Sequence, residues 1–460
     1  MDMVRVCVSL CVCVCVCVPC MTCCLFDLLT IRLIGRFAGI INTEGKMWKE
    51  QRRFLHERLR HFGMKHMGDG REKMENRIMI EVYQMITELA DKKSAPVELG
   101  SYLSSAVSNV ICSLLMSVRF RHDDPKFIRF TNLIDDGFKL FTVTAAAGFI
   151  PILKLLPAFN YAFNKIRQNF GEISNFYQEI VDDHKRSFDA NNIRDIIDGY
   201  ILEIQNAKEE GRSEQLFNGK NGDRQMQQII GDMFSAGTET VKTTLQWATV
   251  FALREPHMQA RVQEELDRVV TRFRMPMLDD LPNLPYTEAF MLEVMRRATA
   301  VPLGTTHSTS RTTTLNGFTI PKGTQVIPLI HAVHMNPALW KDPEVFNPER
   351  FLSADGTKVV KPDYFIPFGV GRRVCLGDVL AKAELFLFFS SLLHTFTLTV
   401  PQGASVPDLR GQAGVTVSPQ TFQVCAKARY VENVVEGETQ SSREPFNVFP
   451  CLPYLSCPVQ

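Results

Sequence analysis

The chain has 460 residues, a formal net charge of +1 and 45% hydrophobic residues. This length is sufficient for a large folded core, and the near-neutral charge argues against a chain-wide basic surface for nucleic acid. Composition therefore indicates a folded protein, but it does not distinguish an enzyme from a binding protein.

The first 38 residues differ in composition from the rest. Eight of the 13 cysteines lie within the first 24 residues, which contain the run CVCVCVCV. A disulfide framework would be spread through the fold, and these cysteines are not. The remainder of the chain is therefore interpreted as intracellular or cytosol-facing. Residues 6–26 carry no formal charge and could span a bilayer, although Pro19, Asp27 and the repeat argue against an anchor. Three interpretations stay open: low-complexity or wrongly assigned sequence, a crude anchor, or a thiolate metal site.

The first half of the remaining chain has the apolar spacing of helices. Residues 74–93, 96–120 and 125–141 each predict a helix, the last after an Asp-Asp-Pro turn. Residues 144–159 are apolar and broken by prolines, which fits either core packing or a mobile segment that contacts a membrane or admits substrate. Residues 211–224 are polar and predict a loop.

The second half adds a small β region. Residues 225–256, 256–270 and 286–298 predict helices, and residues 312–330 contain the hairpin signals Asn-Gly and Pro-Lys-Gly. Short strands are expected over 397–428. The whole predicts one mostly α domain with a smaller β region over residues 39–429, followed by an atypical tail over 430–460.

A cysteine stands in the stretch FGVGRRVCLG, residues 368–377, before another apolar helical stretch. Cysteine acts as a metal ligand or nucleophile in its thiolate form, which cations and a helix N-terminus favour. Because Arg372 and Arg373 precede Cys375, we expect its pKa to be lowered. The glycines allow a flat group to lie against the loop. A structural cysteine in a glycine turn is the alternative.

The same stretch resembles the haem-binding signature F-x-x-G-x-R-x-C-x-G of the cytochrome P450 family, with Phe368, Gly371, Arg373, Cys375 and Gly377 at its fixed positions. The resemblance implies the mostly helical P450 fold, haem b (iron protoporphyrin IX) as cofactor, and Cys375 as the axial ligand of its iron. It also implies that Phe368 packs beside the thiolate and that Arg373 meets a haem propionate.

A second motif is the spacing E-x-x-R at Glu293 and Arg296, which places both side chains on one helix face. Alone, this spacing is more typical of a solvated salt bridge. Because Arg350 follows in the run FNPERF, the resemblance implies a buried Glu–Arg–Arg network with a structural role near the haem pocket.

A third motif, AGTET at residues 236–240, lies inside the long helix predicted over 225–256. Gly237 lowers helix stability, and with Ala236 it leaves room for a ligand; an ordinary small-residue helix contact is the alternative. Glu239 and Thr240 set an acid beside an alcohol, which suits a proton relay. The resemblance implies that this pair delivers protons during dioxygen activation.

Three further residues are implied by the resemblance to contact haem. Trp48 and Arg52 match the family's W-x-x-x-R on an early helix, whose side chains reach a propionate. His307 stands where many relatives place another propionate partner. Phe368, Gly371, Gly377, Ala236 and Gly237 would complete the cofactor-binding set.

The resemblance covers residues 39–429 and implies insertion of one oxygen atom from dioxygen into an apolar substrate. Electrons would come from NADPH through a reductase, which Lys49, Arg53 and Arg372 would face, at the cytosolic side of the endoplasmic reticulum membrane and without nucleic acid. Only 47 residues precede Trp48, so the N-terminal part of the fold is expected to be missing.

The substrate prediction rests on two stretches, residues 39–64 and 365–396, which are similar to the arthropod ecdysteroid 26-hydroxylases. They imply a steroid substrate, in a pocket lined by residues 229–236, 301–306 and 411–418. The alternatives are a xenobiotic or fatty-acid hydroxylase of the same family, a haem-thiolate isomerase that needs no reductase, and a truncated inactive haem-binding product.

Overall fold

The computed structural model describes residues 38–65, 70–149, 151–217 and 221–429. Residues 1–37, and the 430–460 tail that the sequence marks as atypical, lie outside the described residues. The architecture below is that of the described residues, which end at Arg429.

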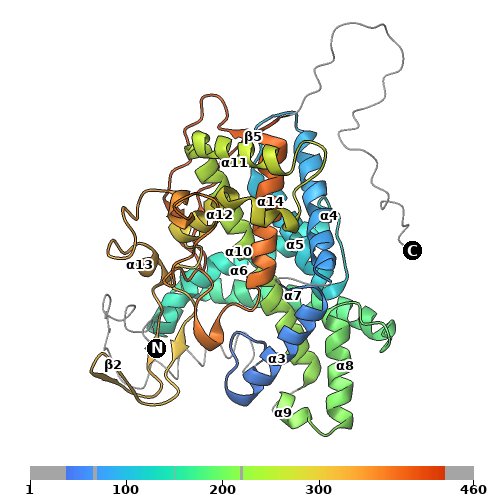
Figure 1. The fold of residues 1–460 in the computed structure, drawn as a ribbon. Coiled ribbons are helices and arrows are strands. Elements are labelled where there is room, and N and C mark those ends of the chain that lie inside the picture. The colour runs from blue at the N-terminus through green and yellow to red at the C-terminus, as the bar shows by residue number, and fades with distance from the viewer. Residues whose placement is uncertain (1–37, 66–69, 150, 218–220, 430–460) are drawn as a thin grey trace, which may run out of the picture. The chain divides into compact units, whose positions relative to one another are not determined.

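Helices dominate the described residues, as the sequence predicts (Figure 1). The α-helices are α3 (Gly45–His61), α4 (Arg71–Ala90), α5 (Leu99–Met116), α6 (Pro125–Phe149), α7 (Pro157–Arg186), α8 (Ile196–Glu209), α9 (Ser213–Phe217), α10 (Gly222–Arg254), α11 (Pro256–Val269), α12 (Pro285–Ala298), α13 (Ile330–His334) and α14 (Asp378–Thr395). Short 3₁₀ helices are η1 (Pro151–Leu155), η2 (Leu278–Asn283), η3 (Pro348–Phe351) and η4 (Gly371–Arg373).

Several helices begin where the sequence supplies a cap. The Asp124 carboxylate accepts the Lys126 backbone N–H at 2.7 Å at the start of α6, and the Asn221 side chain accepts that of Asp223 at the start of α10. Proline occupies the first turn of α7, α11 and α12, where its missing N–H costs no intrahelical bond. These caps fix the ends of the helices that frame the core.

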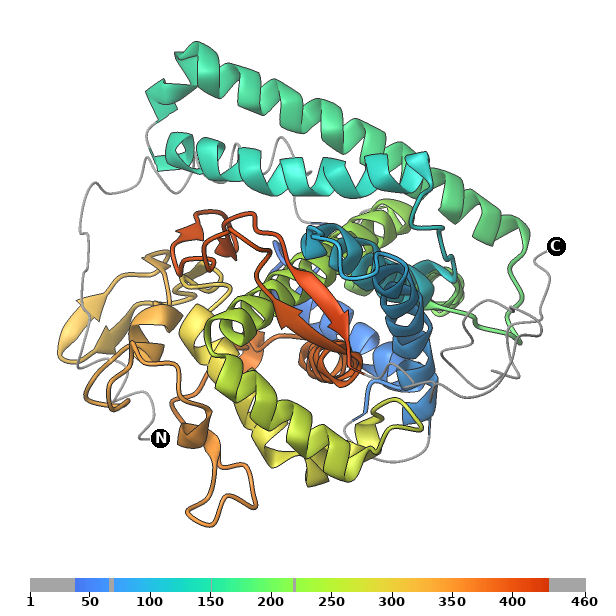
Figure 2. The same ribbon diagram turned by 90° about the horizontal axis from the view of Figure 1, so that it is seen from above.

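The core lies around α10 and α14. Figure 2 shows α14 surrounded by α4, α5, α10, α11 and α12, and α10 packs directly against α5, α12 and α14. Helix α5 is the described helix that is long and apolar enough to cross a membrane, yet 67% of its length is buried within the protein. Its contacts with α4 and α10 explain its composition as that of a core helix.

The described strands form four two-stranded antiparallel pairs: β1 (His307–Ser308) with β4 (Gln325–Val326), β2 (Thr313–Leu315) with β3 (Phe318–Ile320), β5 (Phe396–Thr399) with β8 (Cys425–Ala428), and β6 (Gly411–Gln412) with β7 (Ser418–Pro419). Asn316 and Gly317 turn β2 into β3 with φ values of +48° and +82°, as a two-residue hairpin requires. The mostly α architecture with a small β region is confirmed.

In two regions the structure differs from the sequence prediction or decides between its alternatives. The loop predicted over 211–224 contains α9, because Leu216 and Phe217 are buried and Gln51 donates a 2.8 Å hydrogen bond to the Leu216 carbonyl. The apolar stretch 144–159 finishes α6, forms η1 and starts α7. There Ile152 is 69% and Leu155 81% exposed, so these two side chains do not pack in the core.

Candidate active site

The loop that carries Cys375 is held by its own backbone. The Cys375 N–H donates to the Phe368 carbonyl at 3.0 Å, which closes the loop just before α14. Gly369 and Gly371 adopt φ values of +75° and +78°, a region that side chains with a Cβ rarely occupy. The loop therefore needs glycine for its shape, and it places the cysteine at the mouth of α14.

Cys375 is a free cysteine, and part of its surface is exposed to solvent. Burial raises its pKa above the usual value, and the Gly377 N–H that bonds to the sulfur only partly offsets this. The sequence prediction of a lowered pKa is therefore wrong for the free thiol. The cations that favour the thiolate are Arg52 and Lys382, not the neighbouring Arg372 and Arg373, because spatial proximity decides rather than sequence.

Arg52, Trp48 and Arg373 meet beside this loop. Arg52 of α3 donates a 2.6 Å hydrogen bond to the Val374 carbonyl, and Arg373 donates one of 2.6 Å to the Thr43 carbonyl. The Arg373 guanidinium lies 3.9 Å from the centre of the Trp48 ring, and that of Arg52 lies 5.8 Å from it. Burial lowers the pKa of both arginines, although guanidinium remains charged at neutral pH.

The core helix α10 has a solvent-accessible stretch near its middle. Ala236 is exposed and Thr240 partly exposed, whereas Thr238, Glu239 and Val241 around them are buried. The Thr240 hydroxyl donates to the Ala236 carbonyl at 2.8 Å, within the helix. These two small side chains therefore leave an accessible strip on an otherwise buried helix.

Gly237 follows Ala236, is partly exposed and also faces α5. A Cβ at this position would lie 2.8 Å from the Cδ1 atom of Ile111 on α5. The glycine is thus required by the close approach of α5 and α10, which is the small-residue helix contact weighed as the alternative. Its predicted place in the cofactor-binding set stays a prediction.

Glu239 is held by three side chains on the buried side of α10. Its carboxylate accepts hydrogen bonds from Thr416 at 2.8 Å and Thr243 at 3.3 Å, and it lies 2.6 Å from the Lys242 ammonium. Among the described residues no hydrogen bond joins Glu239 to Thr240. The predicted acid and alcohol are neighbours in sequence, but their functional atoms have different partners.

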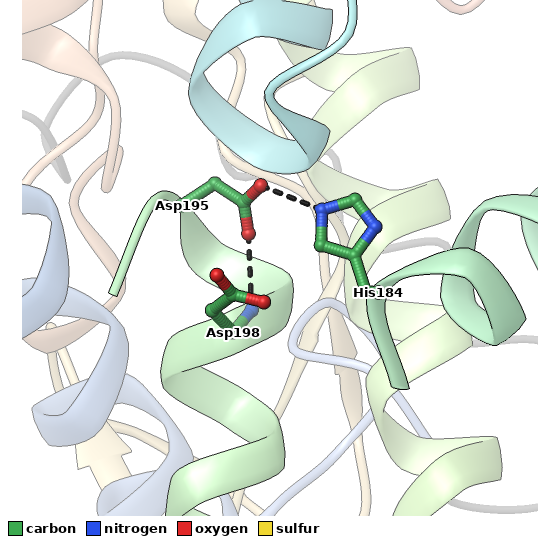
Figure 3. A group of neighbouring side chains, drawn as sticks. All are labelled: His184, Asp195 and Asp198. Carbon is green, nitrogen blue, oxygen red and sulfur yellow. Dashed lines mark hydrogen bonds and ion pairs between the residues drawn. The ribbon is translucent and has the colours of Figure 1, made fainter. Parts of the chain in front are cut away.

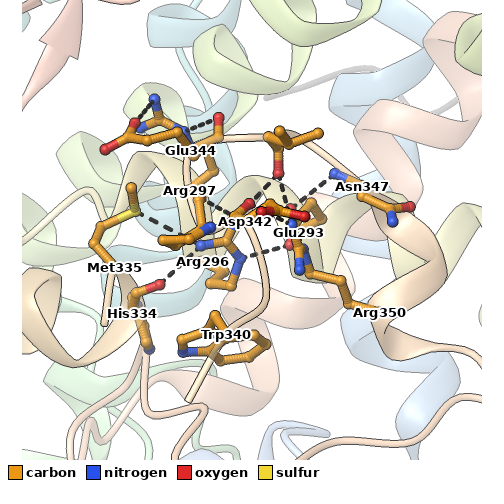
Figure 4. A network of polar contacts seen from close by, with 12 residues as sticks. Glu293, Arg296, Arg297, His334, Met335, Trp340, Asp342, Glu344, Asn347 and Arg350 are labelled. Atoms are coloured by element: carbon orange, nitrogen blue, oxygen red, sulfur yellow. Dashed lines mark hydrogen bonds and ion pairs between the residues drawn. The ribbon is translucent and has the colours of Figure 1, made fainter. Parts of the chain in front are cut away.

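Glu293, Arg296 and Arg350 form one buried network (Figure 4). Arg296 pairs with Glu293 at 2.7 Å with both side chains fully buried, and Arg350 reaches the same carboxylate at 3.2 Å. Arg296 also donates to the His334 carbonyl at 2.8 Å and lies 5.2 Å from the Trp340 ring centre. Each of the three charges therefore has a partner. Because Glu293 and Arg296 lie on α12 and Arg350 lies before the cysteine loop, the network joins these two parts of the chain.

The imidazole of His334 sits beside this network. Burial, followed by the charge of Arg296, lowers the pKa of His334 to about 3. It is therefore neutral, and its Nε2 accepts the Ile366 N–H at 3.0 Å. This bond ties α13 to the segment that leads into the cysteine loop.

The remaining predicted positions are exposed or partly exposed. His307 is exposed on β1, opposite Val326. Lys49, Arg53 and Arg372 are also exposed. The ring of Phe368 lies 4.9 Å from the Lys382 ammonium, and nothing lies within 4 Å of a Cβ built on Gly377.

Sequence reasoning missed a buried cluster of His184, Asp195 and Asp198 (Figure 3). Their ligand-type atoms lie close enough together to hold a metal ion, but each group is already engaged. His184 contacts the Ile180 carbonyl and the Asp195 carboxylate, both at 2.8 Å, and Arg194 binds Asp198. The cluster is therefore an ion-paired joint between α7 and α8.

Sequence reasoning also missed Glu384, on α14. Both of its carboxyl oxygens are buried without a hydrogen-bond partner among the described residues. Burial raises the pKa of Glu384 well above its usual value, because an apolar interior disfavours the charged form. The sequence does contain a signal for this residue. Glu384 is an acid that directly precedes the apolar run LFLFF, where the helical spacing of apolar residues leaves no polar face for a carboxylate.

Comparison with known proteins gives consistent matches. A cytochrome P450 family model matches residues 28–426. The chain is 55% identical over 391 residues to cytochrome P450 18a1 of Drosophila melanogaster, which covers 85% of this chain and 72% of that protein. It is 38% identical to cytochrome P450 2U1 of Rattus norvegicus, covering 87% and 73%, and 37% identical to cytochrome P450 2D6 of Homo sapiens, covering 84% and 75%.

Proposed function

The chain belongs to the cytochrome P450 family and is a haem-dependent monooxygenase, and we propose that it hydroxylates a steroid of the ecdysteroid type, with Cys375 as the residue that would hold the haem iron. Members of this family bind haem b and receive electrons from NADPH through a reductase. The assignment of individual residues below, and of the substrate, is our proposal.

The residues around Cys375 fit a haem. The thiol is accessible while the backbone around it is fixed, and the Gly377 N–H already bonds to the sulfur. A thiol that coordinates a metal is deprotonated on binding, so its raised pKa is no obstacle. Arg52 and Arg373 use one N–H each on backbone carbonyls and retain donors for the carboxylates of the cofactor.

We assign the surrounding side chains from their positions. Arg52, Arg373, Trp48 and His307 would contact the propionates of the cofactor. Phe368, Gly371 and Gly377 would shape the thiolate side of the site, and Ala236 the opposite side. Glu293, Arg296 and Arg350 would support the cysteine loop from behind.

Bound haem supplies the reductive activation of dioxygen and the transfer of one oxygen atom, while the protein supplies thiolate, protons and a dry pocket. Thr240 lies on the open strip of α10, where its hydroxyl can donate or accept a proton. Glu239 lies one residue away and is the acid that would resupply that proton. The loop carrying Thr416 closes over Glu239 and keeps solvent from it.

The substrate proposal is supported by sequence. Residues 39–64 and 365–396 are the stretches similar to ecdysteroid hydroxylases, and the Drosophila relative is more similar to this chain than the mammalian relatives are. The chemistry of the predicted pocket segments agrees with an apolar ligand, because 229–236 and 301–306 are rich in apolar side chains. The site of the hydroxyl group is not part of the proposal.

The test is turnover of an ecdysteroid by the full chain with NADPH and a reductase. We expect a hydroxylated product, with a fatty acid and an aromatic drug-like compound converted at least about tenfold more slowly. Preferential conversion of either comparison compound would overturn the steroid assignment and leave the monooxygenase assignment intact.

The place of action is also a proposal. We propose the cytosolic face of the endoplasmic reticulum membrane, where Lys49, Arg53 and Arg372 would meet the reductase. Their exposure supports this. Replacing Arg372 by Glu should raise the KM for reductase and leave binding of substrate unchanged, because an exposed charge acts mainly on encounter.

A further inference from the structure

A cleft opens between α3, α8 and α9, and none of the residues assigned above to haem lines it. Its volume is about 330 Å³, which lies within the range of small-molecule sites, about 300–1,000 Å³. The side chains of Phe54 and Leu216, both mostly buried, form its apolar surface. Charged side chains of α3 and α8 line the rest. The cleft thus offers a ligand both apolar and ionic contacts.

The apolar surface of the cleft is fixed by buried contacts behind it. The Phe54 ring packs edge-on against the ring of Tyr200 on α8, with ring centres 5.1 Å apart. The Tyr200 hydroxyl donates to the side chain of Gln51, whose amide donates to the Leu216 carbonyl at 2.8 Å. Because these contacts join α3, α8 and α9, the cleft is formed before any ligand binds.

Arg58 of α3 is a half-buried cation in this cleft. Its guanidinium lies 5.5 Å from the centre of the Phe54 ring and makes no ion pair or hydrogen bond among the described residues. Its aliphatic stem runs along α8, where a Cβ built on Gly199 would lie 3.2 Å from the Arg58 Cδ atom. Glycine lowers helix stability, and here it leaves the room that the stem occupies.

The acids that line the cleft do not neutralise Arg58. Glu50 and Glu203 form ion pairs with other arginines. Glu57 is exposed and directly precedes Arg58 in α3, and consecutive helix residues do not face each other. The five N–H donors of the Arg58 guanidinium are therefore available to a ligand.

We propose that this cleft binds a small organic anion, with a carboxylate or phosphate group on Arg58 and an apolar body against Phe54 and Leu216. The planar guanidinium matches either group with two parallel hydrogen bonds. An apolar body that covers the two side chains is removed from water, which favours binding. The site is separate from the oxygenase site and does not depend on the substrate proposed above.

The test is isothermal titration calorimetry of the haem-loaded full chain with phenyl phosphate and with 4-phenylbutyrate. We expect at least one of them to bind with a Kd below about 1 mM. Arg58→Gln should raise that Kd about tenfold or more, because a charged hydrogen-bonded contact is lost. Arg60→Gln is the matched control, since Arg60 is an exposed arginine of the same helix outside the cleft, and it should leave the Kd unchanged.

A second variant separates charge from shape. Arg58→Lys keeps the positive charge but cannot form two parallel hydrogen bonds, so its Kd should lie between those of wild type and Arg58→Gln. Binding of phenyl phosphate alone would identify the ligand as a phosphate, and binding of 4-phenylbutyrate alone as a carboxylate. Absence of binding by both probes, or equal affinity of wild type and Arg58→Gln for each of them, would overturn the proposal.

Discussion

The guanidinium of Arg52 donates a 2.6 Å hydrogen bond to the carbonyl oxygen of Val374, the residue before Cys375. The two residues are 322 positions apart, so this bond joins helix α3 to the cysteine loop. A hydrogen bond from a charged donor typically contributes about 1.5–3 kcal/mol. Arg52 therefore fixes the loop in addition to the propionate role that we propose for it.

Arg52→Leu should lower haem retention about tenfold or more, because a charged hydrogen bond of about 1.5–3 kcal/mol is lost. The measurement is the ratio of haem to protein after gel filtration. Arg53→Leu is the matched control, since its side chain is 67% exposed and pairs only with its helix neighbour Glu50 among the described residues. Equal haem retention in both variants would contradict the role of Arg52.

Arg296→Leu should destabilise the fold by about 3–5 kcal/mol, because it leaves the fully buried Glu293 charge without its principal partner. Arg297→Leu should cost far less, because its partner Glu344 is 75% exposed. The measurement is the free energy of unfolding in urea for the haem-loaded protein. If Arg297→Leu proved as damaging as Arg296→Leu, the network would not have the structural weight assigned to it.

Glu384→Gln should stabilise the protein at pH 8 and leave it unchanged near pH 4. The pKa of Glu384 is raised by burial, so above the ordinary carboxyl range only the unfolded chain ionises, and wild-type stability falls as pH rises. The limiting slope is about 1.4 kcal/mol per pH unit. Urea unfolding at three pH values measures it.

The control for this prediction is Glu214→Gln, since Glu214 is exposed on α9. It should change stability little at any pH. A Glu384→Gln variant that is less stable than wild type at pH 8 would show that the carboxyl has an ionic partner.

His184 should stabilise the protein more at pH 6 than at pH 9. Burial lowers its pKa, but the hydrogen bond and charge of Asp195 outweigh burial and raise the pKa above the usual value. The ion pair is therefore fully present below about pH 6.5 and is lost as pH rises through the raised pKa. The Tm difference between wild type and His184→Gln should shrink across that range.

His257→Gln is the matched control, because His257 is 68% exposed and 3.9 Å from Glu255. Its Tm difference should stay near zero. A zinc-dependent rise in the Tm of wild type that His184→Gln abolishes would instead identify the cluster as a metal site.

Local patterns predicted the local structure well. The helical spacing of apolar residues gave α4, α5, α10, α11, α12 and α14 within a few residues, and Asn316–Gly317 placed the β2–β3 turn. The Glu293–Arg296 pair was foreseeable because three residues bring two side chains to one helix face. The E-x-x-R spacing did not predict that the pair is buried. That prediction came from the family resemblance.

Contacts between distant segments were not predictable from one sequence. The partner of Gly237 is Ile111, on another helix, so the reason for the glycine appears only when α5 and α10 are packed. In the same way, Arg52 rather than Arg372 acts on Cys375. The hydrogen bond from Lys242 to Asp135 joins residues 107 positions apart, and no local sequence pattern predicts it.

The role of Cys375 is tested most directly by the carbon monoxide difference spectrum of the reduced, haem-loaded full chain. We expect the thiolate-type Soret band that is characteristic of cytochromes P450, and its loss in Cys375→Ser with the fold retained. A soluble, well-folded chain that lacks the band, or a Cys375→Ser variant that keeps it, would contradict Cys375 as the iron ligand.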